Sequence, residues 1–158
     1  MGAIDGVRGC DKLPSDIKMI VNLAGNCLIN QHSDINKTAE ILRDTSKCEF
    51  ILVSDLFMTA SAKFADILLP GVSPLEQDNI AMPWQYGDFL GFTKKVVEPL
   101  GECRFEYDWL AELARRLGYG DAFTEGRDSA QWLEHCYNKL RKKERELPPY
   151  EEFSKGGI

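Results

Sequence analysis

Glycine and polar residues follow three short apolar runs of the sequence, at the points where the runs 18–24, 50–53 and 66–69 end. They are Gly25, Asn26, Cys27, Ser54, Asp55 and Gly71. Glycine lets backbone N–H groups approach a ligand closely. A carboxylate accepts hydrogen bonds from a ribose diol or from the adjacent N–H donors of a guanine edge. These residue types therefore indicate nucleotide binding, provided that the three run ends meet in the fold.

No complete phosphate-binding or catalytic motif accompanies these residues. The chain contains neither GxGxxG nor GxxxxGK[ST], so neither nucleotide fingerprint applies. Asp55 alone is equally consistent with a cap of the turn after its run. Asp108 stands in EYDW at the start of a helical pattern, where a carboxylate is more often a helix-terminal charge than a ligand. His32 is interpreted as a solvated loop residue, and no catalytic triad or carboxylate pair is recognisable, so we assign no catalytic residue.

The cysteines do not form a metal-binding pattern. Cys10, Cys27, Cys48, Cys103 and Cys136 are dispersed, with no CxxC pair and no histidine at ligand spacing. An odd, scattered set favours free thiols over a disulfide framework. The apolar or helical surroundings of Cys48 and Cys136 favour core positions. We therefore predict no metal site within this chain.

Composition narrows the function classes further. The chain has 158 residues, a net charge of −6, 44% hydrophobic residues and 28% charged residues, which is ordinary for a globular protein. The acidic balance argues against a sequence-independent nucleic-acid binder, and the basic run 139–145 is interpreted as a solvated helix end. No apolar stretch reaches the roughly 18–20 residues needed to cross a bilayer, so no direct membrane insertion is expected. The first residues lack the apolar core and twin arginine of a signal peptide.

The elements that position these residues alternate between strand and helix. The patterns predict strands at 18–24, 50–53 and 66–69 and helices at 34–43 and 59–64. Ser33 and Thr59 are the expected N-caps of the two helices. Right-handed crossovers between such strands give an α/β, Rossmann-like three-layer domain with a mostly parallel sheet. In such sheets ligands bind outside the carboxyl ends of the strands, which brings the candidate residues to one rim.

The second half of the sequence shows no regular alternation of strands and helices. It is expected to contain a long loop at 72–91, a short strand at 94–98 and helices at 107–117 and 129–145. Gly118 ends the first of these helices, and Asp128 with Gln131 forms a capping box for the second. The resulting division is an irregular lead-in at 1–17, one α/β domain at 18–145 and an extended tail at 146–158.

Two long segments together resemble a known family. AGNCLINQHSDIN (24–36) and FILVSDLFMTASAKFADILLPGVSPLEQDN (50–79) are similar to the molybdopterin oxidoreductases of the dimethyl sulfoxide reductase family. The second segment includes the family pattern T-x-(S/T)-A-x-x-A-D. VVEPLGE and YDWLAELARRLGY match further along, and the resemblance runs from about residue 18 to 140. The anaerobic dimethyl sulfoxide reductase catalytic subunits look closest.

The resemblance implies that the domain grips a molybdopterin guanine dinucleotide. Carried over residue by residue, it implies cofactor contacts from Gly25, Asn26, Cys27, Gln31, Ser54, Asp55, Gly71 and Asp108. The turn from Gly25 to Cys27 would lie against the nucleotide, and Ser54 with Asp55 would bind the guanosine. Cys27 departs from the proline or acidic residue common in the family. Ser33 could replace Gln31, because that loop varies in length.

The resemblance also implies what lies outside the chain. The molybdenum ligand, the iron–sulfur segment and the domain for the second half of the cofactor are not recognisable here, so we read the chain as an internal fragment of a catalytic subunit. Its partners would be the other domains of that subunit, an iron–sulfur electron-transfer subunit and a membrane anchor subunit. The full-length protein would be prokaryotic, membrane-associated and exported by a twin-arginine signal.

Three functions follow from these expectations. The first is the cofactor-binding part of an enzyme that reduces dimethyl sulfoxide or related S- or N-oxides in anaerobic respiration; the isolated chain is then expected to be soluble and inactive, with an apolar sheet face or edge exposed. The second keeps the family and changes the substrate to nitrate, formate, selenate or tetrathionate. The third is a free-standing nucleotide-binding or scaffold module without a metal.

Overall fold

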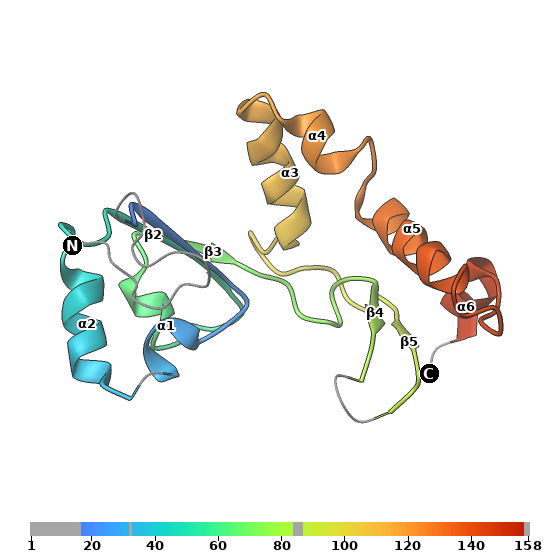
Figure 1. The fold of residues 1–158 in the computed structure, drawn as a ribbon, viewed down its shortest axis with the longest axis horizontal. Helices are drawn as coiled ribbons and strands as arrows, with labels where there is room; N and C mark the ends of the chain where they lie inside the picture. The colour runs from blue at the N-terminus through green and yellow to red at the C-terminus, as the bar shows by residue number, and fades with distance from the viewer. Residues whose placement is uncertain (1–16, 32, 84–86, 157–158) are drawn as a thin grey trace. The chain divides into compact units, whose positions relative to one another are not determined.

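The computed structural model describes residues 17–31, 33–83 and 87–156 (Figure 1). The chain divides into two compact units, residues 1–71 and 72–158, and each is described by itself. The expected lead-in at 1–17 lies outside the described residues except for Ile17, which belongs to no helix or strand.

The first unit is built on a three-stranded parallel sheet. Its strands are β1 (Met19–Leu23), β2 (Phe50–Asp55) and β3 (Ile67–Pro70), in the order β1-β2-β3. Val21 pairs with Leu52, and Leu52 pairs with Ile67 on the other side. All three predicted strands are present and parallel. β2 continues two residues further than expected, so that Ser54 and Asp55 are its last residues.

One face of this sheet packs against helices and forms the core. The core consists of Ile51 and Val53 of the central strand with Cys48 and Ala62. Leu28 of α1 (Cys27–Asn30), Leu42 of α2 (Ile35–Arg43) and Phe64 of the 3-10 helix η1 (Ala62–Phe64) are among the residues that pack against it. The alternation of side chains along a strand sends Ile51 and Val53 to the same face. The buried position predicted for Cys48 is confirmed, at 6% exposure.

The other face of the sheet is apolar and open. Met19, Val21 and Leu23 alternate with less exposed residues along β1 and are 48%, 47% and 40% exposed. Ile67 of β3 is 46% exposed on the same face, because it shares Leu52 as a neighbour with Val21. The parallel sheet is thus established, whereas the three-layer, Rossmann-like arrangement stays a prediction.

Two details of the first unit differ from the expectations. The N-cap of α2 is Asp34, whose carboxylate accepts from Lys37 N at 3.0 Å, and not Ser33, one residue earlier. The expected helix at 59–64 is a short 3-10 turn, η1. Thr59 does act near its start, because the Thr59 hydroxyl accepts from Ala62 N at 3.1 Å.

In its described residues, 72–83 and 87–156, the second unit contains a small antiparallel pair of strands and four helices. The pair is β4 (Asn79–Ala81) with β5 (Gly91–Thr93). The helices are α3 (Glu106–Arg116), α4 (Gly120–Thr124), α5 (Ser129–Arg141) and α6 (Tyr150–Gly156). The expected loop at 72–91 therefore contains a strand, and the expected strand at 94–98 is wrong. Segment 94–98 has no regular secondary structure. It is held by two hydrogen bonds to one carbonyl, since Val96 N and Val97 N both donate to Leu75 O, at 2.8 and 3.1 Å.

The helices of the second unit confirm the capping predictions and correct the tail. The Asp128–Gln131 capping box of α5 is present, and Gly118, after α3, has a φ of 81°. The tail is not extended, because α6 forms there and Phe153 stacks on Tyr137 at 4.4 Å between ring centroids. α5 ends at Arg141 rather than 145.

The predicted free state of the cysteine thiols is confirmed for the described cysteines. The described cysteines Cys27, Cys48, Cys103 and Cys136 are free. Cys136 is exposed, so its predicted core position is wrong. Helical spacing alone did not show which face of α5 packs inward; Tyr137, 1% exposed, is on the packed face.

Candidate functional site

The carboxyl ends of the three parallel strands meet at one edge of the first unit, which we call the rim. Two backbone hydrogen bonds join the segments there: Ala24 N donates to Ser54 O at 2.8 Å, and Gly71 N donates to Asp55 O at 3.1 Å. The turn from Gly25 to Cys27 follows β1 directly. The structure thus brings together Gly25, Asn26, Cys27, Ser54, Asp55 and Gly71, as the strand pattern predicts.

The turn after β1 has a strained backbone that a buried asparagine holds in place. Ala24 has a φ of 49°, in the left-handed region that non-glycine residues rarely adopt. Asn22, 5% exposed, donates through Nδ2 to Gly25 O at 2.5 Å. Its Oδ1 accepts from Cys27 Sγ at 2.8 Å. The hydrogen bonds of the Asn22 side chain therefore hold the turn from within the protein. The Cys27 thiol is one of its partners, so this thiol is directed at Asn22.

A second buried residue, Ser61, fixes the other side of the turn. Ser61 N donates to Asn26 Oδ1 at 3.0 Å. The Ser61 hydroxyl accepts from Leu28 N at 3.0 Å and from Ile29 N at 3.3 Å. Ser61 has no exposed surface. The Asn26 side chain is thus engaged within the protein, and two N–H groups at the start of α1 are satisfied by Ser61.

Three backbone donors of the turn are left for a ligand. Among the described residues, none accepts a hydrogen bond from Gly25 N, Asn26 N or Cys27 N. Successive backbone N–H groups after a left-handed residue form the concave donor sets that bind anions in many proteins. The main chain of the turn, rather than its side chains, is therefore what this part of the rim offers to a phosphate.

Asp55 caps its own turn and keeps capacity for a further partner. Its Oδ1 accepts from Leu56 N at 2.7 Å, and its Oδ2 accepts from the Thr59 hydroxyl at 3.2 Å. A carboxylate has about four acceptor sites, so each oxygen can take another donor. Asp55 is half-buried at the end of β2. The structural role and the predicted ligand role of Asp55 are therefore compatible.

The remaining predicted residues differ in accessibility. Ser54 is fully buried in β2, and its backbone carbonyl accepts from Ala24 N at 2.8 Å. Gly71 is also buried. Gln31, at the C-cap of α1, and its alternative Ser33 are both exposed. Nothing distinguishes Gln31 from Ser33, and the ligand role of either stays a prediction.

Asp108 belongs to the second unit. It lies in the first turn of α3 with an exposed side chain, and it lines a cavity of about 320 Å³ together with Glu76, Gln77 and Arg104. Gln77 Oε1 is buried there without a hydrogen-bond partner. Asp108 keeps its predicted role as a proposal, with the acceptor chemistry of a carboxylate and no donor bound to it among the described residues.

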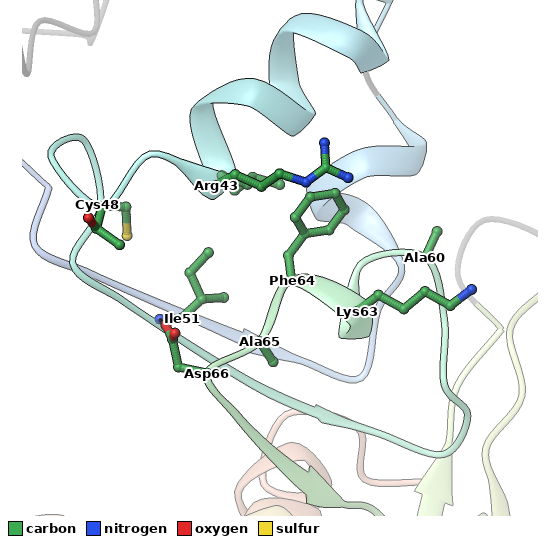
Figure 2. A pocket seen from close by; sticks show the side chains of 10 residues that line it. Arg43, Cys48, Ile51, Ala60, Lys63, Phe64, Ala65 and Asp66 are labelled. Carbon is green, nitrogen blue, oxygen red and sulfur yellow. Dashed lines mark hydrogen bonds between the residues drawn. The ribbon is translucent and has the colours of Figure 1, made fainter.

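Another cavity lies at the opposite edge of the sheet in the first unit (Figure 2). It measures about 420 Å³ and is lined by residues that include Cys48, Ile51 and Asp66 near the amino ends of β2 and β3. Asp66 Oδ2 accepts from Ile51 N at 2.7 Å. The Arg43 guanidinium lies over the Phe64 ring at 5.1 Å from its centroid, as Figure 2 shows. None of the predicted ligand residues lines this cavity.

The described residues contain no group of three or more His, Cys, Asp or Glu side chains arranged to coordinate a metal ion. In the same part of the chain, no helix is both long and apolar enough to span a bilayer. What the rim offers is a set of backbone N–H donors beside a carboxylate.

The sequence of the chain matches a family model described as molybdopterin oxidoreductase over residues 5–116. The chain belongs to the molybdopterin oxidoreductase family. A molybdopterin is the cofactor that the family name denotes. The match to the family model confirms the resemblance described above.

Relatives and solved structures agree with the family. The chain is 52% identical to dimethyl sulfoxide reductase DmsA of Escherichia coli (strain K12), over 98% of the chain and 19% of that protein. It is 37% identical to dimethyl sulfoxide/trimethylamine N-oxide reductase of Cereibacter sphaeroides, over 90% of the chain and 18% of that protein. The structure superimposes on acetylene hydratase from Pelobacter acetylenicus with a TM-score of 0.71 and 26% identity, over 91% of the chain and 18% of the other. The chain thus spans about a fifth of the length of each of these proteins.

Proposed function

We propose that the chain is the part of a molybdopterin oxidoreductase catalytic subunit that binds the nucleotide end of a molybdopterin guanine dinucleotide. The observation that carries this proposal is the rim. Three N–H groups of the turn from Gly25 to Cys27, for which no described residue is an acceptor, lie next to the strand end that carries Asp55. Phosphate oxygens accept from such N–H groups, and a carboxylate accepts from a ribose or a guanine edge.

The chain's own contribution is to position the cofactor. The bound cofactor supplies the redox chemistry in enzymes of this kind. The turn binds the anionic part through its main chain, and Asp55 accepts from the nucleoside while it keeps its own turn closed. Gln31, Ser54, Gly71 and Asp108 complete the proposed set of cofactor-binding residues, in a Rossmann-like domain.

For the full-length protein we propose reduction of dimethyl sulfoxide or a related S- or N-oxide in anaerobic respiration. The names of the two reductases similar to the chain support this choice. Other domains of the subunit, an iron–sulfur electron-transfer subunit and a membrane anchor are the proposed partners, with iron–sulfur and molybdenum ligands outside this chain. Export by a twin-arginine signal and membrane association belong to the same proposal.

A second candidate keeps the family and changes the reaction. Acetylene hydratase shares the fold at a TM-score of 0.71, and its name denotes a hydration rather than a reduction. A common fold therefore does not determine the reaction. Turnover of nitrate, formate, selenate or tetrathionate by the full-length protein, in place of dimethyl sulfoxide, would favour this candidate. A reading frame that contains this chain alone would favour the free-standing module.

Replacement of Asp55 tests the cofactor-binding proposal. In the full-length protein, Asp55→Ala should lower the GMP released by acid hydrolysis, and the molybdenum content, about tenfold, because a hydrogen bond to a charged group is lost. Asp55→Asn, which keeps an acceptor oxygen for the turn, should lower them less.

The matched control is Asp44→Ala. Asp44 also caps a turn, accepting from the backbone N–H and the hydroxyl of Ser46 at 3.0 and 2.6 Å, but it follows α2 and lies away from the rim. This variant should keep its cofactor. Normal GMP and molybdenum contents in Asp55→Ala would contradict the proposal.

A further inference from the structure

We propose that Ser61 is a positioning residue of the rim, which fixes the turn from Gly25 to Cys27 in the conformation that binds the cofactor. This inference rests on the proposed function. Ser61 touches no ligand in this proposal, because it has no exposed surface. It acts through Asn26 and through the start of α1.

Ser61 makes three hydrogen bonds to the turn and to the residues that follow it. Its N–H donates to Asn26 Oδ1 at 3.0 Å, and its hydroxyl accepts from Leu28 N and Ile29 N at 3.0 and 3.3 Å. Asn26 belongs to the turn, and the two N–H groups follow it directly. The N–H groups that Ser61 binds and the three that are left free are therefore consecutive along the chain.

α1 needs this support because it is very short. It has four residues and no side-chain cap of its own, and a single helical turn does not persist without outside contacts. The first N–H groups of a helix have no partner within it. Ser61 supplies that partner from a distant segment, so that the direction of the free N–H groups is set before any ligand binds.

Ser61 is also linked to Asp55. The Asp55 carboxylate accepts from the Thr59 hydroxyl at 3.2 Å, and the same hydroxyl accepts from Ala62 N at 3.1 Å. These bonds fix the backbone on both sides of Ser61. The two ligand-binding parts of the rim, the turn and Asp55, are thus joined through these hydrogen bonds and the peptide bond between Ser61 and Ala62.

The test compares how fast full-length holoenzyme variants release their cofactor, measured as GMP that remains with the protein after gel filtration at intervals. Ser61→Ala should release GMP about tenfold faster, because the hydroxyl acceptor of two backbone donors is lost. Ser61→Thr keeps the hydroxyl, so this variant should release GMP about as slowly as the wild-type protein.

A stability control separates positioning from general loosening. Cys48→Ala removes a buried side chain of the same core, at the opposite edge of the sheet. It should lower the thermal midpoint by an amount similar to Ser61→Ala and leave the release rate unchanged. If both variants release GMP equally fast at matched stability, Ser61 is a structural residue only and the inference is overturned.

A double-mutant cycle gives a second, independent readout. Asn26→Ala removes the acceptor of Ser61 N, whereas Ser61→Ala removes the acceptor of Leu28 N and Ile29 N. Because both changes loosen the same turn, the double variant should release GMP more slowly than the product of the two separate effects predicts. Effects that simply multiply would contradict a shared role of the two residues in fixing the turn.

The outcomes also separate this inference from the function on which it rests. If Asp55→Ala loses cofactor while Ser61→Ala behaves like Cys48→Ala, only the inference fails. If neither rim variant differs from the wild-type protein in cofactor content or release, the inference and the proposed cofactor site both fail.

Discussion

Asp55 shows how one side chain can serve the fold and the ligand at once. Each of its oxygens accepts one hydrogen bond from its own turn, which fixes the carboxylate without saturating it. Asn26 and Cys27 differ, because their side chains point to Ser61 and Asn22. The departure of Cys27 from the family's usual residue is therefore compatible with binding, since its main-chain N–H rather than its thiol is available.

A residue-level prediction concerns Glu76 in the second unit. Hydrogen bonds from Ser73 and from Leu100 N hold the pKa of the Glu76 carboxyl below its ordinary value of 4.5. A lowered folded-state pKa stabilises the protein above the unfolded value, and the contribution is lost as pH falls through the folded value. Glu76→Gln should lower the thermal midpoint at neutral pH, and the difference should shrink below about pH 4.5.

Thermal unfolding between about pH 3 and 7 checks this prediction. Glu102→Gln, at an exposed position, is the matched control and should leave the curve unchanged. A difference between Glu76→Gln and wild type that is constant over this range would show that the charge of Glu76 does not contribute.

At the level of elements, the sequence predicted most of what local physics determines. The three parallel strands and the α5 capping box were predicted because apolar runs and capping residues act within a few positions. Asn22 and Ser61 were missed because their roles depend on partners in other segments. The only signals were a polar residue inside the run VNLAG and a serine inside TASAKFA. α6 was missed because two prolines, read as extended, precede it; proline is also favoured at helix starts.

The α5 capping box gives an element-level prediction. Asp128 accepts from Gln131 N at 2.8 Å, and Gln131 Oε1 accepts from Asp128 N at 2.9 Å. Asp128→Ala should lower the free energy of unfolding by about 1 kcal/mol, measured by urea denaturation followed by circular dichroism. Glu134→Ala, an exposed change on the same helix, should be close to neutral. Equal effects of the two substitutions would contradict the assigned role of the cap.

For the whole molecule, the main feature is the open apolar face of the parallel sheet. Val21 and Ile67 are 47% and 46% exposed there, in a chain that spans about a fifth of its relatives. Exposed apolar sheet faces of this kind promote association. We therefore expect the stability of the 158-residue chain and its solubility to depend on different residues.

Polar substitution on this face tests that separation. Val21→Thr and Ile67→Thr keep β-branched side chains and should change the free energy of unfolding by less than about 0.5 kcal/mol. They should nevertheless reduce binding of a hydrophobic fluorescent dye to the isolated chain. Val53→Thr, at a fully buried core position, should instead destabilise the protein clearly. Unchanged dye binding in the two surface variants would show that the face is not the apolar surface that the dye detects.

The tryptophans of the chain all belong to one of its two units. The three tryptophans of the chain are Trp84, Trp109 and Trp132, all in the second unit. The Trp132 indole donates to the Tyr107 hydroxyl at 2.9 Å and lies under the Arg127 guanidinium, so its emission depends on the packing of α3 against α5. The intrinsic emission of these indoles thus originates outside the unit that contains Asp55 and Ser61. A tryptophan introduced into the first unit would give that unit an intrinsic emission signal of its own.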